Sequence, residues 1–330
     1  MSKIVVGVDL GGTNIAGVLI DEKGELKGSK VWPTEAEYGP EHILRRIIEL
    51  IRTLLEENGF TLNQLQGVGV GVPGLVNTRE GRSIISHNLP GWKDIAVAQK
   101  IHEEINAPVF IENDVRMAAW GEKLLGAGQD KEDIVCLTLG TGIGSGIFIQ
   151  GKMFKGRKES AGEIGHMTVE KDGLRCNCGN YGCLELYASG RGIARRAKEA
   201  LANHTSSLIL KLVNGDINQI TAATVCTAAK QGDELALKVI KETALYLGIG
   251  LANVANLLNP QRIILGGGVM QAGELLLEPT REVVYSRALP LNREVEIVPA
   301  KLGEWAGAIG GAMLAKMQFI EGRSSLEWVW

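Results

Sequence analysis

The sequence lacks an excess of one charge and lacks any long apolar run. Its 35 lysines and arginines against 38 aspartates and glutamates give a formal net charge of −3, which argues against a nucleic-acid or membrane-surface partner. The first apolar run ends at Asp9, too early for a signal peptide or a membrane span. We therefore expect a soluble, cytoplasmic protein with no nucleic-acid partner and no membrane partner.

Cysteine is also scarce, yet three of the five cysteines lie within "RCNCGNYGCLE" at positions 175–185. In a reducing compartment these thiols do not form disulfides. Four side chains in this part of the chain are of the types that hold zinc in closed, structural sites: His166, Cys176, Cys178 and Cys183. Cys-x-Cys is tighter than the usual Cys-x-x-Cys spacing, so reduced thiols without a metal stay the alternative. Cys136 and Cys226 are expected in the core.

Two common phosphate-binding motifs are absent as well. No Gly-Lys-Ser/Thr follows a glycine loop, which excludes a P-loop. The stretch "GTGIGSG" leads into the strand-like "GIFIQG", whereas a dinucleotide fingerprint must open a helix. What the sequence does have is glycine, with 43 residues grouped into turns that follow apolar strands.

The glycine turns repeat along the chain. A predicted strand at Lys3–Val8 leads into "DLGGT", and a second at Val135–Leu139 leads into "GTGIGSG"; each turn is followed by a returning strand. A shift of 129 positions places Gly11 on Gly140. We expect two domains that each begin with a strand–turn–strand hairpin.

Helical patterns alternate with these strands, which predicts α/β architecture. Pro40–Asn58 carries one apolar stripe, and a further helix is expected at Asp94–Asn106. Three segments are predicted: a smaller N-terminal domain at 1–117, a larger domain with the cysteine stretch at 118–303, and a C-terminal helix at 304–330 that packs back on the first domain. The final "IEGRSSLEWVW" resembles a linker with vector residues and is left out of the functional argument.

Glycine lets backbone N–H groups approach an anion without a side chain in the way. Two such turns facing each other across a cleft can hold a polyphosphate, with hydroxyls from Thr13 and Thr141. Asp9 adds one carboxylate beside the phosphates, which suits Mg²⁺. The alternative is that these turns are tight hairpins without a ligand.

"END" at 112–114 follows a predicted strand at Val109–Ile111. Asp114 at the carboxyl end of a strand lies where open α/β sheets bind ligands, and a carboxylate there can accept the proton of an attacking sugar hydroxyl. The alternative is that Asp114 only caps the following helix.

Further polar side chains could bind vicinal hydroxyls, and these are Glu163, His166 and Glu185. The stretches "GVPGLVN" and "HNLPGW" are expected as loops, in which Asn88 could contact a hydroxyl and Trp92 belongs to the core.

With these motifs in order, the chain resembles the ROK family of sugar kinases, within the actin/hexokinase/Hsp70 superfamily. The resemblance covers about residues 3–318 and rests on "DLGGT", "ENDV", "LGTGIGSGI", "GEIGH", "CNCGNYGCLE" and "GGGV", with "HNLPGW" most similar to the glucokinase branch. It implies a two-domain, actin/hexokinase-like (ribonuclease H-like) α/β fold with the active site in a cleft between the domains. It also favours the zinc interpretation, and it implies a homodimer or homotetramer.

The resemblance implies roles for individual residues. Asp114 would be the catalytic base. Residues that would bind sugar hydroxyls are Gly74, Asn88, Asn113, Glu163, His166 and Glu185. Residues that would lie around the nucleotide, with Asp9 for Mg²⁺, are Gly11, Gly12, Thr13, Gly140, Thr141, Gly142, Gly266, Gly267 and Gly268.

The expected reaction is therefore ATP-dependent phosphorylation of glucose at O6. Other hexoses (N-acetylmannosamine, fructose, allose) and a non-catalytic sugar sensor of the same fold stay open, as do a dehydrogenase and other phosphoryl donors. A DNA-binding repressor of this family would need an N-terminal helix-turn-helix, for which the strand beginning at Ile4 leaves no room.

Overall fold

The computed structural model of the chain describes residues 2–86, 88–202 and 206–322. Its contacts divide the chain into two units: unit 1 comprises residues 1–130, 156–159 and 301–330, and unit 2 comprises residues 131–155 and 160–300. The domain boundary expected after residue 117 falls inside helix α3, Asp114–Leu124, all of which belongs to unit 1.

Unit 1 is built on a five-stranded sheet with the strand order β3-β2-β1-β4-β8. Its strands are β1 (Ile4–Leu10), β2 (Asn14–Asp21), β3 (Leu26–Pro33), β4 (Leu65–Val72) and β8 (Val109–Asn113). β1, β4 and β8 are parallel, and β2 and β3 are antiparallel neighbours. A small antiparallel sheet is formed by β5 (Leu75–Asn77), β6 (Arg82–Ile85) and β7 (Lys93–Ile95).

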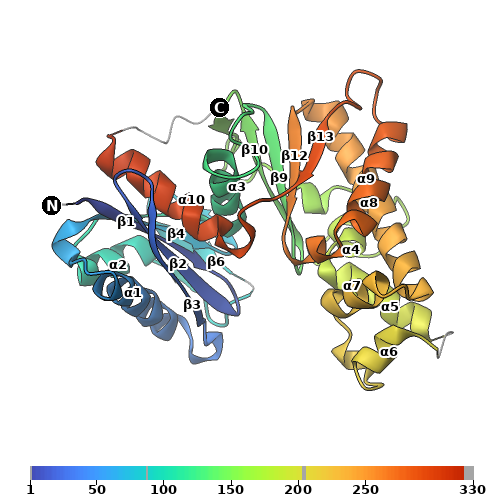
Figure 1. The fold of residues 1–330 in the computed structure, drawn as a ribbon, viewed down its shortest axis with the longest axis horizontal. Coiled ribbons are helices and arrows are strands. Elements are labelled where there is room, and N and C mark those ends of the chain that lie inside the picture. The colour runs from blue at the N-terminus through green and yellow to red at the C-terminus, as the bar shows by residue number, and fades with distance from the viewer. Residues whose placement is uncertain (1, 87, 203–205, 323–330) are drawn as a thin grey trace. The chain divides into compact units, whose positions relative to one another are not determined.

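Helices cover both faces of the larger sheet (Figure 1). α1 (Pro40–Glu57) and α2 (Val97–Ile105) pack on one face, and α10 (Ala306–Ala315) packs on the other, beside α3. Successive residues of a strand point to opposite faces, so both faces of β1 must be apolar to be buried. Val6 and Val8 accordingly join the α1 core, whereas Val5 joins the α10 core.

The sheet and α10 approach each other at backbone distance. A Cβ on Gly7 would collide with the carbonyl oxygen of Ala308, and a Cβ on Gly311 would lie 2.7 Å from the carbonyl oxygen of Gly69. Gly7 in β1 and Gly311 in α10 are therefore required by this contact.

Unit 2 repeats the same sheet. Its strand order is β11-β10-β9-β12-β13, and the strands are β9 (Ile134–Leu139), β10 (Ile143–Ile149), β11 (Lys152–Met153), β12 (Arg262–Gly266) and β13 (Glu296–Pro299). β9 and β10 form an antiparallel hairpin, and β12 and β13 extend the sheet in parallel. The predicted repeat of a strand–turn–strand hairpin is confirmed, since β1–β2 and β9–β10 hold the same places in their sheets.

The helices of unit 2 supply most of its apolar core, and their places are labelled in Figure 1. They are α4 (Glu185–Ala188), α5 (Gly190–Leu201), α6 (Leu208–Leu212), α7 (Ala222–Lys230), α8 (Glu234–Leu258) and α9 (Glu274–Arg287). α8 and α9 pack against each other, and the short 3₁₀ helix η5 (Gly268–Ala272) follows β12. Among the described residues, no helix combines the length and the apolar character that crossing a membrane requires.

The prediction of a helix over Asp94–Asn106 is wrong at its start. Residues Lys93–Ile95 form β7, and α2 begins only at Val97. Asp94 has a φ of 52°, and Arg82 Nε donates to its Oδ1 at 3.0 Å, so an ion pair between β6 and β7 holds it outside a helix. Trp92 is buried as expected, and its Nε1 donates to Ser83 Oγ at 2.9 Å.

A buried carboxylate ties α3 to the segment before α10. Glu122 is only 3% exposed and accepts hydrogen bonds from the N–H groups of Ala127 (2.8 Å), Lys301 (3.0 Å) and Leu302 (2.8 Å). These hydrogen bonds satisfy backbone N–H groups that lie outside helices and strands. They also fix the segment that leads into α10.

We expect Glu122→Ala to lower the free energy of unfolding by about 3–5 kcal/mol, because it removes the charged acceptor of three backbone donors. Thermal and urea unfolding measure the change. Glu49→Ala, on the exposed side of α1, is the control and should change stability by no more than about 0.5 kcal/mol. An equally small effect at Glu122 would contradict a structural role for this carboxylate.

Candidate active site

Two aspartates lie at the carboxyl edge of the parallel strands of unit 1. Asp9 pairs with Gly71 across β1 and β4, Gly71 pairs with Glu112 across β4 and β8, and Asp114 follows two residues later. A Cβ on Gly71 would lie 3.2 Å from Asp9 Oδ1 and 3.5 Å from Asp114 Cα. The absence of a side chain at Gly71 therefore keeps space open between the Asp9 carboxylate and the start of α3.

Asp114 is the first residue of α3, and its two oxygens differ. Oδ1 accepts from the N–H of Val115 and from Nδ2 of Asn113, both at 2.9 Å. Among the residues that the structure describes, no other residue donates a hydrogen bond to Oδ2. The N-cap of α3 is Asn113, whose side chain accepts from the N–H of Arg116, so capping does not account for Asp114.

Burial raises the pKa of Asp114 above its ordinary value, against the opposing effects of its hydrogen bonds and of Arg116. A carboxylate with one oxygen fixed, one oxygen open and a raised pKa has the properties of a general base.

Asp9 carries an uncompensated carboxylate. Burial and then the negative charge of Asp114 raise the pKa of Asp9 to about 8. Within the described part of the chain its carboxylate accepts no hydrogen bond, and it lies against Gly307, where a Cβ would collide with it. An oxygen ligand of this kind, beside a second carboxylate, fits a hard divalent cation such as Mg²⁺.

The first glycine turn joins β1 to β2. The N–H of Gly11 donates to the carbonyl of Asn14 at 2.8 Å. Thr34, just after β3, closes the turn: its Oγ1 donates to the carbonyl of Gly11 and its N–H donates to the carbonyl of Thr13, both at 2.7 Å. A Cβ on Gly12 would lie 3.3 Å from the carbonyl oxygen of Asn88. Asn88 is thus brought to the turn; its neighbour in "HNLPGW", His87, lies outside the described residues.

Asn113 and Gly74 are also brought together. Asn113 Nδ2 donates to the carbonyl of Gly74 at 3.1 Å, and Gly74 has a φ of 91° that a side chain would strain. Four sequence-predicted residues, Gly74, Asn88, Asn113 and Asp114, therefore all lie in unit 1.

The second glycine turn, in unit 2, is closed by the N–H of Gly140 on the carbonyl of Gly142 at 3.0 Å. Helix α5 begins against it, since the N–H of Gly190 bonds to Gly140 O at 2.8 Å and Nε of Arg191 donates to Thr141 O at 3.0 Å. No atom lies within 4 Å of where a Cβ on Gly140 would stand, so one side of the turn faces open space.

The third turn follows β12. Gly266 ends the strand, Gly267 has a φ of 87° and packs against the carbonyl of Leu139, and Gly268 begins η5 with open space at its missing Cβ. The second and third turns therefore lie side by side at the ends of β9 and β12.

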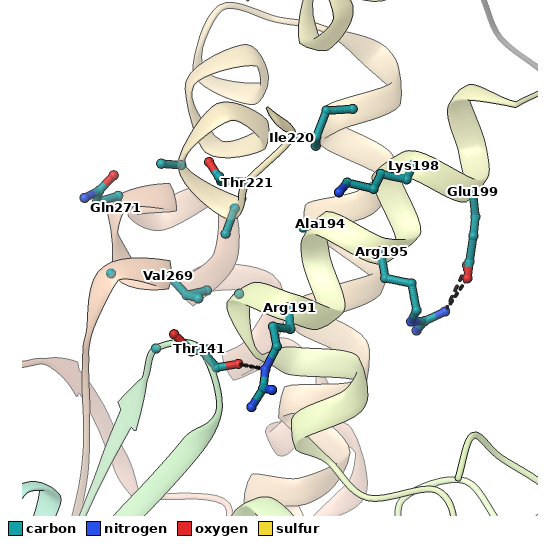
Figure 2. A pocket seen from close by; sticks show the side chains of 15 residues that line it. Thr141, Arg191, Ala194, Arg195, Lys198, Glu199, Ile220, Thr221, Val269 and Gln271 are labelled. Atoms are coloured by element: carbon teal, nitrogen blue, oxygen red, sulfur yellow. Dashed lines mark hydrogen bonds and ion pairs between the residues drawn. The ribbon is translucent and has the colours of Figure 1, made fainter. Parts of the chain in front are cut away.

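A cavity of about 790 Å³ opens beside these two turns (Figure 2). Gly140, Thr141 and Gly268 line one side, and side chains from α5, the start of α7 and η5 line the rest. Apolar groups such as Ala194 and Val269 alternate with charged ones. The volume suits a nucleoside, with the glycine turns at its edge.

The four predicted zinc ligands cluster. One ligand atom from each of His166, Cys176, Cys178 and Cys183 lies within 4.8 Å of all the others. Cys178 Sγ and Cys183 Sγ are 3.7 Å apart, as are Cys176 Sγ and His166 Nδ1. Two thiolates bound at 2.3 Å to one tetrahedral zinc lie about 3.8 Å apart, so the spacing fits that ion.

The electrostatics of the cluster agree with a cation. Burial raises the pKa of Cys176, and burial together with the neighbouring thiols raises the pKa of Cys183 to about 12. The N–H of Asn180 lowers the pKa of the exposed Cys178. A zinc ion would supply the positive charge that three thiolates at this distance need.

Glu185 lies between the cluster and the second glycine turn. Its Oε1 is 3.4 Å from Cys176 Sγ and 3.7 Å from His166 Nδ1, and its Oε2 lies 2.7 Å from where a Cβ on Gly142 would stand. Glu163 is exposed, just before His166 in the 3₁₀ helix Ile164–His166. Three of the predicted hydroxyl-binding residues are therefore in unit 2.

Several residues that shape these sites were not predicted. Thr34, Gly71, Gly307 and Arg191 reach them from other elements, and no motif marks them. Gly71 and Gly307 could have been noticed in the sequence only because each interrupts a run of apolar residues.

The two repeated sheets and their glycine turns define a protein of the actin/hexokinase-like class. The chain belongs to the ROK family, whose model matches residues 5–318. It is 40% identical to a glucokinase of Halalkalibacterium halodurans over 95% of both chains. It is 31% identical to the xylose repressor of Bacillus subtilis, over 96% of this chain and 78% of the repressor.

Among solved structures, a ROK family glucokinase of Streptomyces griseus in complex with glucose and AMPPNP matches with a TM-score of 0.83 and 36% identity. The match covers 95% of this chain and 99% of that one. The expected fold class and the resemblance to the ROK family are thereby confirmed.

The raised pKa of Asp9 predicts how stability depends on pH. The folded protein holds the Asp9 proton up to about pH 8, whereas the unfolded chain releases it near pH 4, so stability falls as pH rises through this window. Asp9→Asn should therefore unfold less readily than wild type at pH 9, by about 1–3 kcal/mol, and show little difference at pH 4. Urea unfolding without Mg²⁺ at both pH values measures this, and a pH-independent difference would contradict it.

The cysteine cluster predicts about one zinc per chain by elemental analysis. Cys178→Ser should lose the metal and lower the melting temperature, although Cys178 is exposed and leaves no core cavity. Cys226→Ala, in the core of unit 2, is the control: it should lower the melting temperature but keep the metal. Wild-type protein that is stable and free of zinc would contradict a structural metal.

Proposed function

We propose that this chain, an ATP-dependent sugar kinase of the ROK family, phosphorylates glucose at O6 with Asp114 as the general base. The observation that carries the proposal is the state of the Asp114 carboxylate, with Oδ1 held by two donors and Oδ2 open. The similarity to proteins named glucokinase over nearly the whole chain supports glucose as the acceptor.

In the proposed reaction, O6 of glucose attacks the γ-phosphorus of ATP while its proton passes to Oδ2 of Asp114. The bond from the γ-phosphorus to the bridging oxygen breaks, and ADP leaves with that oxygen. Because burial raises the pKa of Asp114, the carboxylate holds the transferred proton more readily than an exposed aspartate would. Phosphoryl transfer needs little covalent help, so most of the rate comes from positioning and charge stabilisation.

The sugar would be held by some side chains that donate hydrogen bonds to its hydroxyls and by others that accept from them. Asn113, with its amide on the Gly74 carbonyl, would contact hydroxyls near Asp114, with Asn88 as a further partner. Glu163 and Glu185 would accept from vicinal hydroxyls. His166, bound to zinc through Nδ1, would carry its proton on Nε2 and donate to the sugar.

The nucleotide would occupy the cavity of unit 2, with its phosphates on the glycine turns. The adenosine part fits the wall between α5, α7 and η5, and the N–H groups of Thr141 and Gly142 would face the phosphates. Asp9 would hold Mg²⁺, which, when bound, neutralises charge on the phosphates.

Three other functions remain to be separated by experiment: a kinase for another hexose, a sugar sensor that leaves ATP intact, and a repressor like the xylose repressor that the chain also resembles. A coupled ADP-release assay over glucose, N-acetylmannosamine, fructose and allose separates a kinase and its preferred hexose from the two non-catalytic functions. Glucose should give the highest kcat/KM. Turnover with another hexose alone would correct the substrate, and no turnover with any sugar would overturn the kinase.

The base assignment has its own test. Asp114→Asn should lower kcat about 10²- to 10⁴-fold, which corresponds to roughly 3–5 kcal/mol of barrier, and leave glucose binding within a few-fold of wild type. Asp172→Asn, an exposed position with a side-chain exposure of 81%, is the control and should leave kcat unchanged. If Asp114→Asn keeps more than about a tenth of normal kcat, another group accepts the proton.

A further inference from the structure

We propose that Arg191 is a nucleotide-contacting residue, whose guanidinium binds the phosphate chain of ATP at the Gly140–Gly142 turn. This inference rests on the proposed function, since it needs the nucleotide in the cavity of unit 2. Nothing in the local sequence marks Arg191, because it is one of four basic residues between positions 191 and 198.

The first observation is how the side chain is anchored. Arg191 is the second residue of α5, and its Nε donates to the carbonyl of Thr141 at 3.0 Å (Figure 2). Its Nη2 lies 3.9 Å from where a Cβ on Gly142 would stand. The guanidinium is thus held along the backbone of the turn, and the anchoring bond uses only one of its five N–H donors.

The second observation is the absence of a counter-charge. Arg191 is exposed, and within the described part of the chain it has no carboxylate at ion-pair distance. Glu185 Oε2 also approaches Gly142, yet it makes no ion pair with Arg191. Arg195, one turn later on the same helix, is by contrast paired with both oxygens of Glu199, at 2.8 and 2.9 Å.

The third observation is the open space at the turn. No atom lies within 4 Å of where a Cβ on Gly140 would stand, and the cavity begins there. A planar fork of unused donors, fixed beside the open side of the turn, matches the oxygens of a phosphate. The negative charge of ATP supplies the partner that Arg191 lacks.

A cation at this position would act on the reaction as well as on binding. The transferring phosphoryl group spreads negative charge over its oxygens, and a fixed arginine lowers the energy of that state. Because the guanidinium is already oriented by Thr141, it needs little reorganisation when the nucleotide enters.

The test compares nucleosides that differ only in phosphate. We expect Arg191→Gln to weaken ATP binding about 10- to 100-fold, to weaken ADP binding by less, and to leave adenosine binding within about twofold, as measured by calorimetry. The same variant should lower kcat with glucose. Arg191→Lys should fall between wild type and Arg191→Gln, since the ammonium keeps the charge but loses the fork.

Arg287→Gln, on the exposed end of α9, removes the same charge far along the chain from the turn and serves as the control, with ATP binding unchanged. Equal losses of adenosine and ATP affinity in Arg191→Gln would show a structural role and overturn the inference, as would unchanged ATP binding. If wild type phosphorylates glucose and Arg191→Gln binds ATP as tightly as wild type does, this inference is wrong and the proposed function stands. Wild type without turnover overturns the proposed function itself.

Discussion

The close approach between α10 and the first sheet is the contact on which the unit 1 site depends. Glycines in both partners remove the side chains that would hold them apart. A Cβ on Gly311 would lie only 2.7 Å from the carbonyl oxygen of Gly69. The same approach places Gly307, in the first turn of α10, directly against the carboxylate of Asp9. The N-terminal end of a helix carries partial positive charge, so this placement partly offsets the cost of burying Asp9.

The helix end offsets only part of the cost of burying Asp9, and the remaining cost bears on function. Asp9 and Asp114 each have a raised pKa, because burial opposes the ionisation of both and the negative charge of Asp114 further opposes that of Asp9. Such a pair destabilises the empty protein and favours the binding of a cation and of a group that can give up a proton. The carboxylates that would do the chemistry are therefore also a source of strain in the unliganded fold.

The two units show how one sheet can serve two purposes. Both use the same strand order and the same hairpin turn after the first strand. In unit 1 that strand ends near Asp9, whereas the corresponding position in unit 2 is Thr138. Unit 2 instead has α5 packed against its turn and a cavity beside it. The buried carboxylate Asp9 thus belongs to unit 1, and the cavity of about 790 Å³ belongs to unit 2.

Much of this organisation could be predicted from the amino-acid sequence. Apolar periodicity indicated the first strand and α1, and glycine after apolar strands indicated the turns. The spacing of Cys176, Cys178 and Cys183 indicated a metal cluster, whose ligand atoms the structure brings within 4.8 Å. These features are local, so neighbouring residues carry the whole signal.

The features that the sequence could not predict involve residues distant along the chain. Thr34 closes the first turn, Gly307 borders Asp9, and Arg191 lies along the Gly140–Gly142 turn, each from a different element. The start of α2 also depended on the pairing of Arg82 with Asp94. Apart from that boundary, the sequence indicated most of the strands, turns and helices, because these depend on local propensity and periodicity. The charge, space and pKa at each site were decided by packing, because they depend on which distant groups folding brings within a few ångströms.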